Sequence, residues 1–327
     1  MINAPFGPFW MALLISALLG WPMLLVLRRL RAHASISQYT PEHAGKAGTP
    51  SMGGIAPLLA MIVTVWLVSI TSNAYLETVE VGPDFHWPIE QFRAILIGLF
   101  GFGLLGFVDD FLIPRFLSGK RGLGWTQKLL AQLAVVSLMV GALGLGSIQL
   151  SLTVGFIILF FANAVNFSDG LDGLCGGLLI LSTVFYMTGI VGFAAMAMVG
   201  ALVPFMFLNA PPAKIFMGDV GALPFGATYG VMFATALIDQ SEIHSLTYVI
   251  CVLVTISLIF ILELALVPIQ LFWVKVFKRR LIPASPVHHS FEKLGWPETR
   301  ITAIFLLIQF ILTMIAMSSA LGTWRML

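Results

Sequence analysis

The stretch Asn163-Ala-Val-Asn-Phe-Ser-Asp-Gly-Leu-Asp-Gly-Leu174 lies between two apolar runs, Leu150–Phe161 and Leu178–Ala201. On a helix, Asp169 and Asp172 would share one face with Asn166, because residues three positions apart are neighbours there. Carboxylates beside apolar runs of membrane-spanning length are costly, and they are rarely retained for structure alone. The stretch therefore indicates a functional site at the ends of membrane-spanning helices.

The composition agrees with a chain that is solvated by lipid. Of its 327 residues, 59% are hydrophobic and only 10% are charged, against about 25% charged residues in soluble proteins. Apolar runs of about 20 residues can cross the hydrocarbon core, and the absence of alternating patterning favours helices over a barrel. The net charge of +2 gives no reason to expect a nucleic-acid partner. We therefore predict an all-α integral membrane protein with a single polytopic domain, residues 1–327.

We predict about ten transmembrane helices from the apolar runs. Their approximate ranges are 9–28, 53–71, 92–112, 128–146, 150–166, 174–191, 193–209, 220–238, 246–274 and 301–322. The ninth span carries Glu263 and Pro268, so we expect it to be kinked or broken there.

The basic residues predict the orientation. Fifteen of the seventeen Lys and Arg residues fall in the odd-numbered loops, whereas the second loop carries four acidic residues. By the positive-inside rule the odd-numbered loops are cytoplasmic, and both termini lie outside, in the periplasm. Five polar segments then share the cytoplasmic face and predict one composite active site: Lys46–Gly54, Asp109-Asp110, Asn163–Leu174, Asn209–Asp219 and Pro286–Glu292.

Several carboxylates facing one cavity repel each other unless a cation lies among them. Mg²⁺, held by one or two carboxylates and by substrate phosphates, is the usual solution. Asp219 could instead cap a helix, and Asp109-Asp110 could be a solvated helix end at the membrane interface. Adjacent side chains on a helix point about 100° apart, so we expect Asp109 and Asp110 to divide their tasks.

Basic side chains of these segments and of the third loop, on the same predicted face, suit phosphate. Lys46, Lys120 and Lys128 are natural phosphate partners, although each could merely anchor the chain at the membrane surface. His288 and His289 suit phosphate or sugar contacts better than joint binding of one metal ion, with plain loop polarity as the alternative. From the residues alone, the chain is a phosphate-handling integral membrane enzyme.

Five motifs in this order resemble those of the phospho-N-acetylmuramoyl-pentapeptide transferase family (translocase I), which belongs to the polyprenyl-phosphate N-acetylhexosamine-1-phosphate transferases. The motifs are Gly48-Thr-Pro-Ser-Met-Gly-Gly54, Gly106-Phe-Val-Asp-Asp110, Asn163–Leu174, Phe216-Met-Gly-Asp-Val-Gly221 and Pro286-Val-His-His-Ser-Phe-Glu-Lys-Leu-Gly-Trp-Pro-Glu298. The resemblance covers the chain from Lys46 to Arg300.

The resemblance implies a Mg²⁺-dependent reaction of peptidoglycan synthesis at the cytoplasmic face of the bacterial plasma (inner) membrane. UDP-N-acetylmuramoyl-pentapeptide and undecaprenyl phosphate would give lipid I and UMP, by direct attack or through an aspartyl-phosphate. Membrane lipid is a further expected partner, and a homodimer is left open. Two alternatives remain: a transferase of another N-acetylhexosamine 1-phosphate, such as that of UDP-N-acetylglucosamine, and an ion-coupled secondary transporter.

The resemblance also implies residue roles. Asp219 is the expected Mg²⁺ ligand, Asp109 would deprotonate or position the lipid phosphate beside Asp110, and His288 is the fourth expected catalytic residue. The expected substrate-binding residues are Lys46, Thr49, Lys120, Lys128, Asn166, Asp169, Asp172, Asn209 and His289. One position departs from the family, because Ser290 stands where a third consecutive histidine is usual.

Overall fold

The computed structural model describes residues 6–30, 48–76, 89–117, 122–188 and 191–320, and within these ranges every regular element is helical. The long helices are α1 (Gly7–Leu30), α2 (Ile55–Leu76), α3 (Ile89–Phe107), α5 (Trp125–Leu143), α6 (Ile148–Phe167), α7 (Leu174–Thr183), α8 (Gly192–Asn209), α9 (Asp219–Ser241), α10 (Leu246–Phe277) and α12 (Glu298–Ala320). The short elements are η2 (Val108–Leu112), α4 (Ile113–Phe116), η3 (Val184–Thr188) and α11 (Val287–Lys293). The predicted all-α fold is confirmed.

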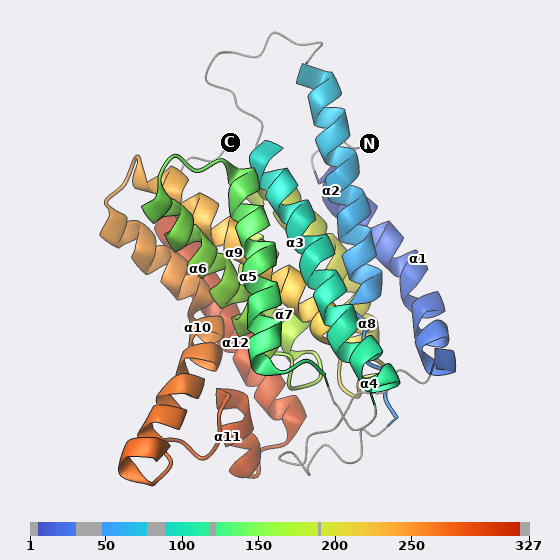
Figure 1. Cartoon of the computed structure of the whole chain (residues 1–327), viewed down its shortest axis with the longest axis vertical. Helices are drawn as coiled ribbons and strands as arrows, with labels where there is room; N and C mark the ends of the chain where they lie inside the picture. Colours follow the sequence, from blue (N-terminus) through green and yellow to red (C-terminus); the bar gives the residue numbers. More distant parts are fainter. Residues whose placement is uncertain (1–5, 31–47, 77–88, 118–121, 189–190, 321–327) are drawn as a thin grey trace.

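The helices have the dimensions of membrane spans. Eight helices of the described ranges are long and apolar enough to cross a membrane, and two shorter apolar segments, Ile55–Thr71 and Leu174–Met187, match the second and sixth predicted spans. The long helices run along the bundle, and the short helices α4 and α11 lie at its lower end in Figure 1. The protein is therefore a multi-pass helical membrane protein, while the count of ten spans and the orientation stay predictions.

Helix α9 occupies the centre of the bundle. It is the most deeply enclosed of the candidate spans, with 83% of its apolar stretch buried, and it packs against α3 and α6. Glycines allow this close packing, because a Cβ at Gly230 would lie 2.7 Å from the Cα of Ile158 on α6. Small residues let membrane helices approach closely. The centre of the bundle therefore fixes the position of Asp219, the first residue of α9.

Helix α10 was expected to be kinked or broken near Glu263 and Pro268. It runs unbroken from Leu246 to Phe277 with Pro268 inside it, and Figure 1 shows it changing direction along its length, so of the two outcomes the structure has the kink. A proline removes one backbone hydrogen bond and crowds the preceding turn, which bends a helix without ending it when its neighbours support it.

The third predicted span is not a uniform helix. After Phe107 the chain forms the π-helical turn η2, Val108–Leu112, before α-helical geometry resumes at Ile113. Such turns insert an extra residue into a helix and frequently occur at functional sites. Asp109 and Asp110 are the second and third residues of this turn.

Candidate active site

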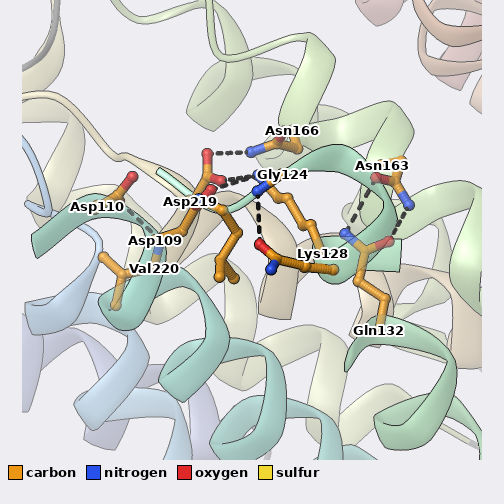
Figure 2. Close-up of polar contacts among 11 residues, drawn as sticks. Asp109, Asp110, Gly124, Lys128, Gln132, Asn163, Asn166, Asp219 and Val220 are labelled. Atoms are coloured by element: carbon orange, nitrogen blue, oxygen red, sulfur yellow. Dashed lines mark hydrogen bonds and ion pairs between the residues drawn. The ribbon is translucent and has the colours of Figure 1, made fainter. Parts of the chain in front are cut away.

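Asp219 lies at the lower end of α9 and has two side-chain partners. Its Oδ1 accepts a hydrogen bond of 2.7 Å from the Asn166 amide, and its Oδ2 contacts the Lys128 ammonium (Figure 2). The N-cap of α9 is Gly218, and no side-chain capping bond forms there. The helix-cap alternative for Asp219 is therefore wrong, and its carboxylate is directed to side chains of α5 and α6.

Gly218 allows the acidic residues to approach each other. Its φ is +72°, a region that favours glycine, and a Cβ there would lie 2.6 Å from the Oδ2 of Asp110 and 2.9 Å from the Oγ of Ser51. The segment before Asp219 is also fixed by the first motif, because Gly53 and Gly54 donate backbone hydrogen bonds to Phe216 (2.7 Å) and Met217 (3.0 Å).

The π-helical turn gives its two carboxylates different partners. The Oδ1 of Asp109 accepts from the backbone N–H of Leu123 at 2.5 Å, and its Oδ2 accepts from Lys128 at 2.9 Å. The Oδ2 of Asp110 accepts from the backbone N–H of Val220 at 3.3 Å. Asp109 thus faces the lysine, whereas Asp110 faces the first turn of α9 (Figure 2). A functional division between them stays a prediction.

Lys128 is the cation that lies among the carboxylates. Its ammonium bridges Asp109 and Asp219, and its side chain is 21% exposed.

The described residues include no group of three or more His, Cys, Asp or Glu side chains arranged to bind a metal ion. The carboxylates of Asp109 and Asp219 on Lys128 nevertheless offer oxygen atoms, the ligand type that Mg²⁺ prefers, and Mg²⁺ needs only one or two carboxylates when phosphates complete its shell. The oxygen chemistry of these carboxylates is compatible with Mg²⁺, and Asp219 as its ligand stays a prediction.

Asp169 connects the turn after α6 to the start of α9. Its Oδ2 accepts a hydrogen bond of 3.0 Å from the backbone N–H of Gly218. Burial raises the pKa of the Asp169 carboxyl to about 6, and the nearby charge of Asp219 acts in the same direction. The carboxyl is thus a positioning group for the residue that precedes Asp219.

Asp172 and Asn209 tie loops together. The Oδ2 of Asp172 accepts from the backbone N–H of Ala213 at 2.9 Å. The Oδ1 of Asn209 accepts from Gly173 N at 3.2 Å, and its Nδ2 donates to Ile215 O at 2.9 Å. Both side chains are buried. These contacts make both residues loop anchors, and the predicted substrate binding by Asp172 and Asn209 stays a prediction.

The two histidines are held by different carboxylates. His288 is fully buried, and its Nδ1 lies 3.0 Å from the Oε2 of Glu263 on α10. His289 is partly exposed, with its Nδ1 2.5 Å from Glu292, and the two imidazole rings lie 4.2 Å apart. Sequence reasoning related Glu263 only to the bend of α10. A carboxylate in an apolar span needs a polar partner, and the loop that follows α10 is polar, so the sequence could have indicated that Glu263 has a partner there.

Comparison with known proteins decides the family. Residues 92–238 match the model of glycosyl transferase family 4. The phospho-N-acetylmuramoyl-pentapeptide-transferase of Staphylococcus saprophyticus is 32% identical, over 90% of this chain and 92% of that protein. The proteins of that name from Clostridium perfringens and Oceanobacillus iheyensis are also 32% identical, over 94% and 95% of this chain and 95% and 96% of theirs. The chain belongs to the phospho-N-acetylmuramoyl-pentapeptide-transferase family. It is a phospho-glycosyl transferase.

Ser290, the departure from the family's motif noted in the sequence, has a clear local role. Its hydroxyl donates to Ala284 O at 2.5 Å and accepts from Ala284 N at 3.0 Å. The serine thus closes the loop that leads into α11. Of the other predicted site residues, Thr49 is partly buried in the first motif, and Lys46 and Lys120 lie outside the described residues.

Gln132 is a neighbour of the site that sequence reasoning missed. It lies one helical turn beyond Lys128 on α5 and exchanges hydrogen bonds of 3.2 and 2.9 Å with the amide of Asn163 (Figure 2). The signal was its four-residue spacing from Lys128, which puts both side chains on one face of the helix. The pair connects α5 to α6 and so supports Lys128 and Asn166 together.

Proposed function

We propose that the protein transfers phospho-N-acetylmuramoyl-pentapeptide from its UDP conjugate to undecaprenyl phosphate, giving lipid I and UMP. The site would lie at the cytoplasmic face of the bacterial plasma membrane. The observation that carries the proposal is the junction of Asp109, Lys128 and Asp219 at the start of the central helix, in a chain that matches transferases of that name over nearly its whole length.

The reaction forms one bond and breaks another. An oxygen of the lipid phosphate attacks the β-phosphorus of the UDP-sugar, and the bond from that phosphorus to the bridging oxygen breaks, so UMP leaves. Phosphoryl transfer depends on positioning and on the neutralisation of charge. Mg²⁺, when bound at Asp219, would supply much of that neutralisation.

The residues around Asp219 would do the positioning. Asn166 directs the Asp219 carboxylate through its amide, and Lys128, in contact with that carboxylate, would supply a positive charge to the reacting phosphates. Asp109 is the candidate base, because its Oδ2 lies beside that lysine at the edge of the group. A carboxylate in this position could take up a proton from the lipid phosphate or attack the β-phosphorus itself.

The variant Asp109→Asn separates these roles from a structural one. Its side chain keeps an oxygen for the Leu123 N–H and loses the charge, so we expect turnover to fall by at least about a hundredfold. Near-normal turnover would remove Asp109 from the chemistry. Phospho-N-acetylmuramoyl-pentapeptide held covalently on the wild-type protein, with UMP released in the absence of acceptor lipid, would favour the covalent route.

UMP release tests the proposed function directly. Purified protein is combined with Mg²⁺, undecaprenyl phosphate and one UDP-sugar at a time, with the Asp219→Asn variant as the inactive control. We expect UMP only with UDP-N-acetylmuramoyl-pentapeptide. Release with UDP-N-acetylglucosamine alone would favour the alternative transferase, and the absence of UMP with every donor would overturn the enzyme proposal.

A further inference from the structure

Glu263 is a fully buried carboxylate on α10 that the proposed reaction does not use. It accepts hydrogen bonds from three donors at the start of α11: Val287 N at 2.9 Å, His288 N at 3.3 Å and His288 Nδ1 at 3.0 Å. A buried carboxylate in an apolar helix is expensive unless it is paired. Its partners here all belong to one short segment, so Glu263 fixes how that segment docks.

These contacts also fix the imidazole of His288. With the Glu263 carboxylate as the acceptor, the imidazole donates from Nδ1, and in a neutral ring this leaves the lone pair on Nε2. That Nε2 is buried, and no described residue offers it a hydrogen-bond partner. An unprotonated Nε2 can lie against carbon–hydrogen groups without leaving a buried N–H that lacks an acceptor.

The group that faces Nε2 is the backbone of Gly170. A Cβ added at Gly170 would overlap the Nε2 of His288 and lie 2.9 Å from its Cε1, so only glycine leaves room for the ring. The preceding residue is Asp169, whose carboxylate accepts the Gly218 N–H next to Asp219. A continuous set of contacts therefore leads from Glu263 on α10 to the start of α9.

We propose that Glu263 is a positioning residue that acts through His288. By fixing the orientation of the imidazole, it holds the Asp169–Gly170 turn against the start of α9, and so sets the direction of the Asp219 carboxylate. The activity test of this inference rests on the proposed function, whereas the test of the His288 tautomer does not.

Two substitutions at Glu263 and one on the same helix test the inference. Glu263→Leu removes all three acceptors, and we expect kcat per folded protein to fall at least about tenfold, as for other orienting partners of site residues. Glu263→Gln keeps an oxygen for Val287 N and His288 Nδ1, so kcat should stay within about threefold of wild type. Gln270→Leu is the matched control, because Gln270 is also buried on α10 and bonds the backbone of Leu281 and Ile282 without contacting His288.

A double-mutant cycle separates positioning through His288 from a general loss of packing. If Glu263 acts through the imidazole, Glu263→Leu should change kcat less than about twofold in a His288→Ala background. Multiplying effects of the two substitutions would overturn the inference. A fall in kcat for Gln270→Leu as large as that for Glu263→Leu would also overturn it.

The tautomer can be measured without activity. In protein labelled with ¹⁵N-histidine, the signals that His288→Ala removes should show a protonated Nδ1 and an unprotonated Nε2, and Glu263→Leu should abolish this preference. The opposite tautomer in the wild type would overturn the inference even in an active enzyme. A wild type without UMP release that shows the expected tautomer would refute the proposed function and leave the docking by Glu263 intact.

Discussion

Gly106 is the position at which one methyl group should displace the candidate site. It lies near the end of α3, two residues before the π-helical turn, and faces the first peptide of α9. A Cβ there would lie 2.5 Å from the carbonyl oxygen of Asp219 and would also overlap the Asp219 carbon and the Val220 nitrogen. These atoms belong to the backbone, so no side-chain rotation can relieve the overlap.

The size of the displacement follows from these contacts. Ordinary van der Waals contact begins near 3.4 Å, so Gly106→Ala must separate α3 from α9 by about 1 Å. Asp109 and Asp110 would move with the π-helical turn, away from Asp219. A misplacement of this size can reduce turnover about a hundredfold. Overpacking of this kind costs about 1–3 kcal/mol of stability, which should lower the melting temperature by several degrees.

The assay is UMP release per folded protein, with the melting temperature measured in the same detergent. Gly141→Ala is the matched control, because it also replaces a helical glycine, on α5, where an added Cβ meets nothing within 4 Å. We expect the control to keep wild-type activity. If Gly106→Ala stays within threefold of the control, the contact of the π-helical turn with α9 does not set the geometry of the site, and the reasoning fails.

Three further predictions concern side chains of the site. Lys128→Met should reduce UMP release by at least about a hundredfold, because Asp109 and Asp219 lose the cation between them; turnover within threefold of wild type would contradict this. Asn209→Ala should lower the free energy of unfolding by about 1–3 kcal/mol, with activity per folded protein retained, because two buried backbone groups lose their partner; lost activity at unchanged stability would instead place Asn209 at the substrate. In metal-free buffer, the raised Asp169 pKa of about 6 means that the folded protein binds this proton more tightly than the unfolded chain. The melting temperature of the wild type should therefore fall relative to Asp169→Asn as pH rises from 5 to 7, and parallel curves would refute the assignment.

The helices could be predicted because lipid imposes a simple rule on the sequence. Each apolar run must satisfy its own backbone, so length and composition alone identify a helix. The same simplicity concealed the π-helical turn at Val108–Leu112, because a helix with apolar residues on every side carries no periodicity that would reveal an extra residue.

The members of the site were more predictable than their partners. Placing the polar segments and the basic odd-numbered loops on one membrane face grouped Asp109, Lys128 and Asp219, which the structure brings into contact. The sequence could not reveal that Asp172 meets the backbone of Ala213, or that Glu263 meets His288. Contacts of this kind depend on how loops from distant parts of the chain pack together. The spacing of residues within one segment does not predict that packing.

The turn after α6 has a consequence for how the enzyme is made. The backbone N–H of Asp172 donates to Glu298 at 2.6 Å, and its carbonyl accepts from Thr302, so this turn is anchored by residues that are synthesised about 130 positions later. A nascent chain inserted as far as α10 would carry every aspartate of the site while these anchors were still missing. Activity should therefore arise late in biogenesis, at the moment when the first turn of α12 docks.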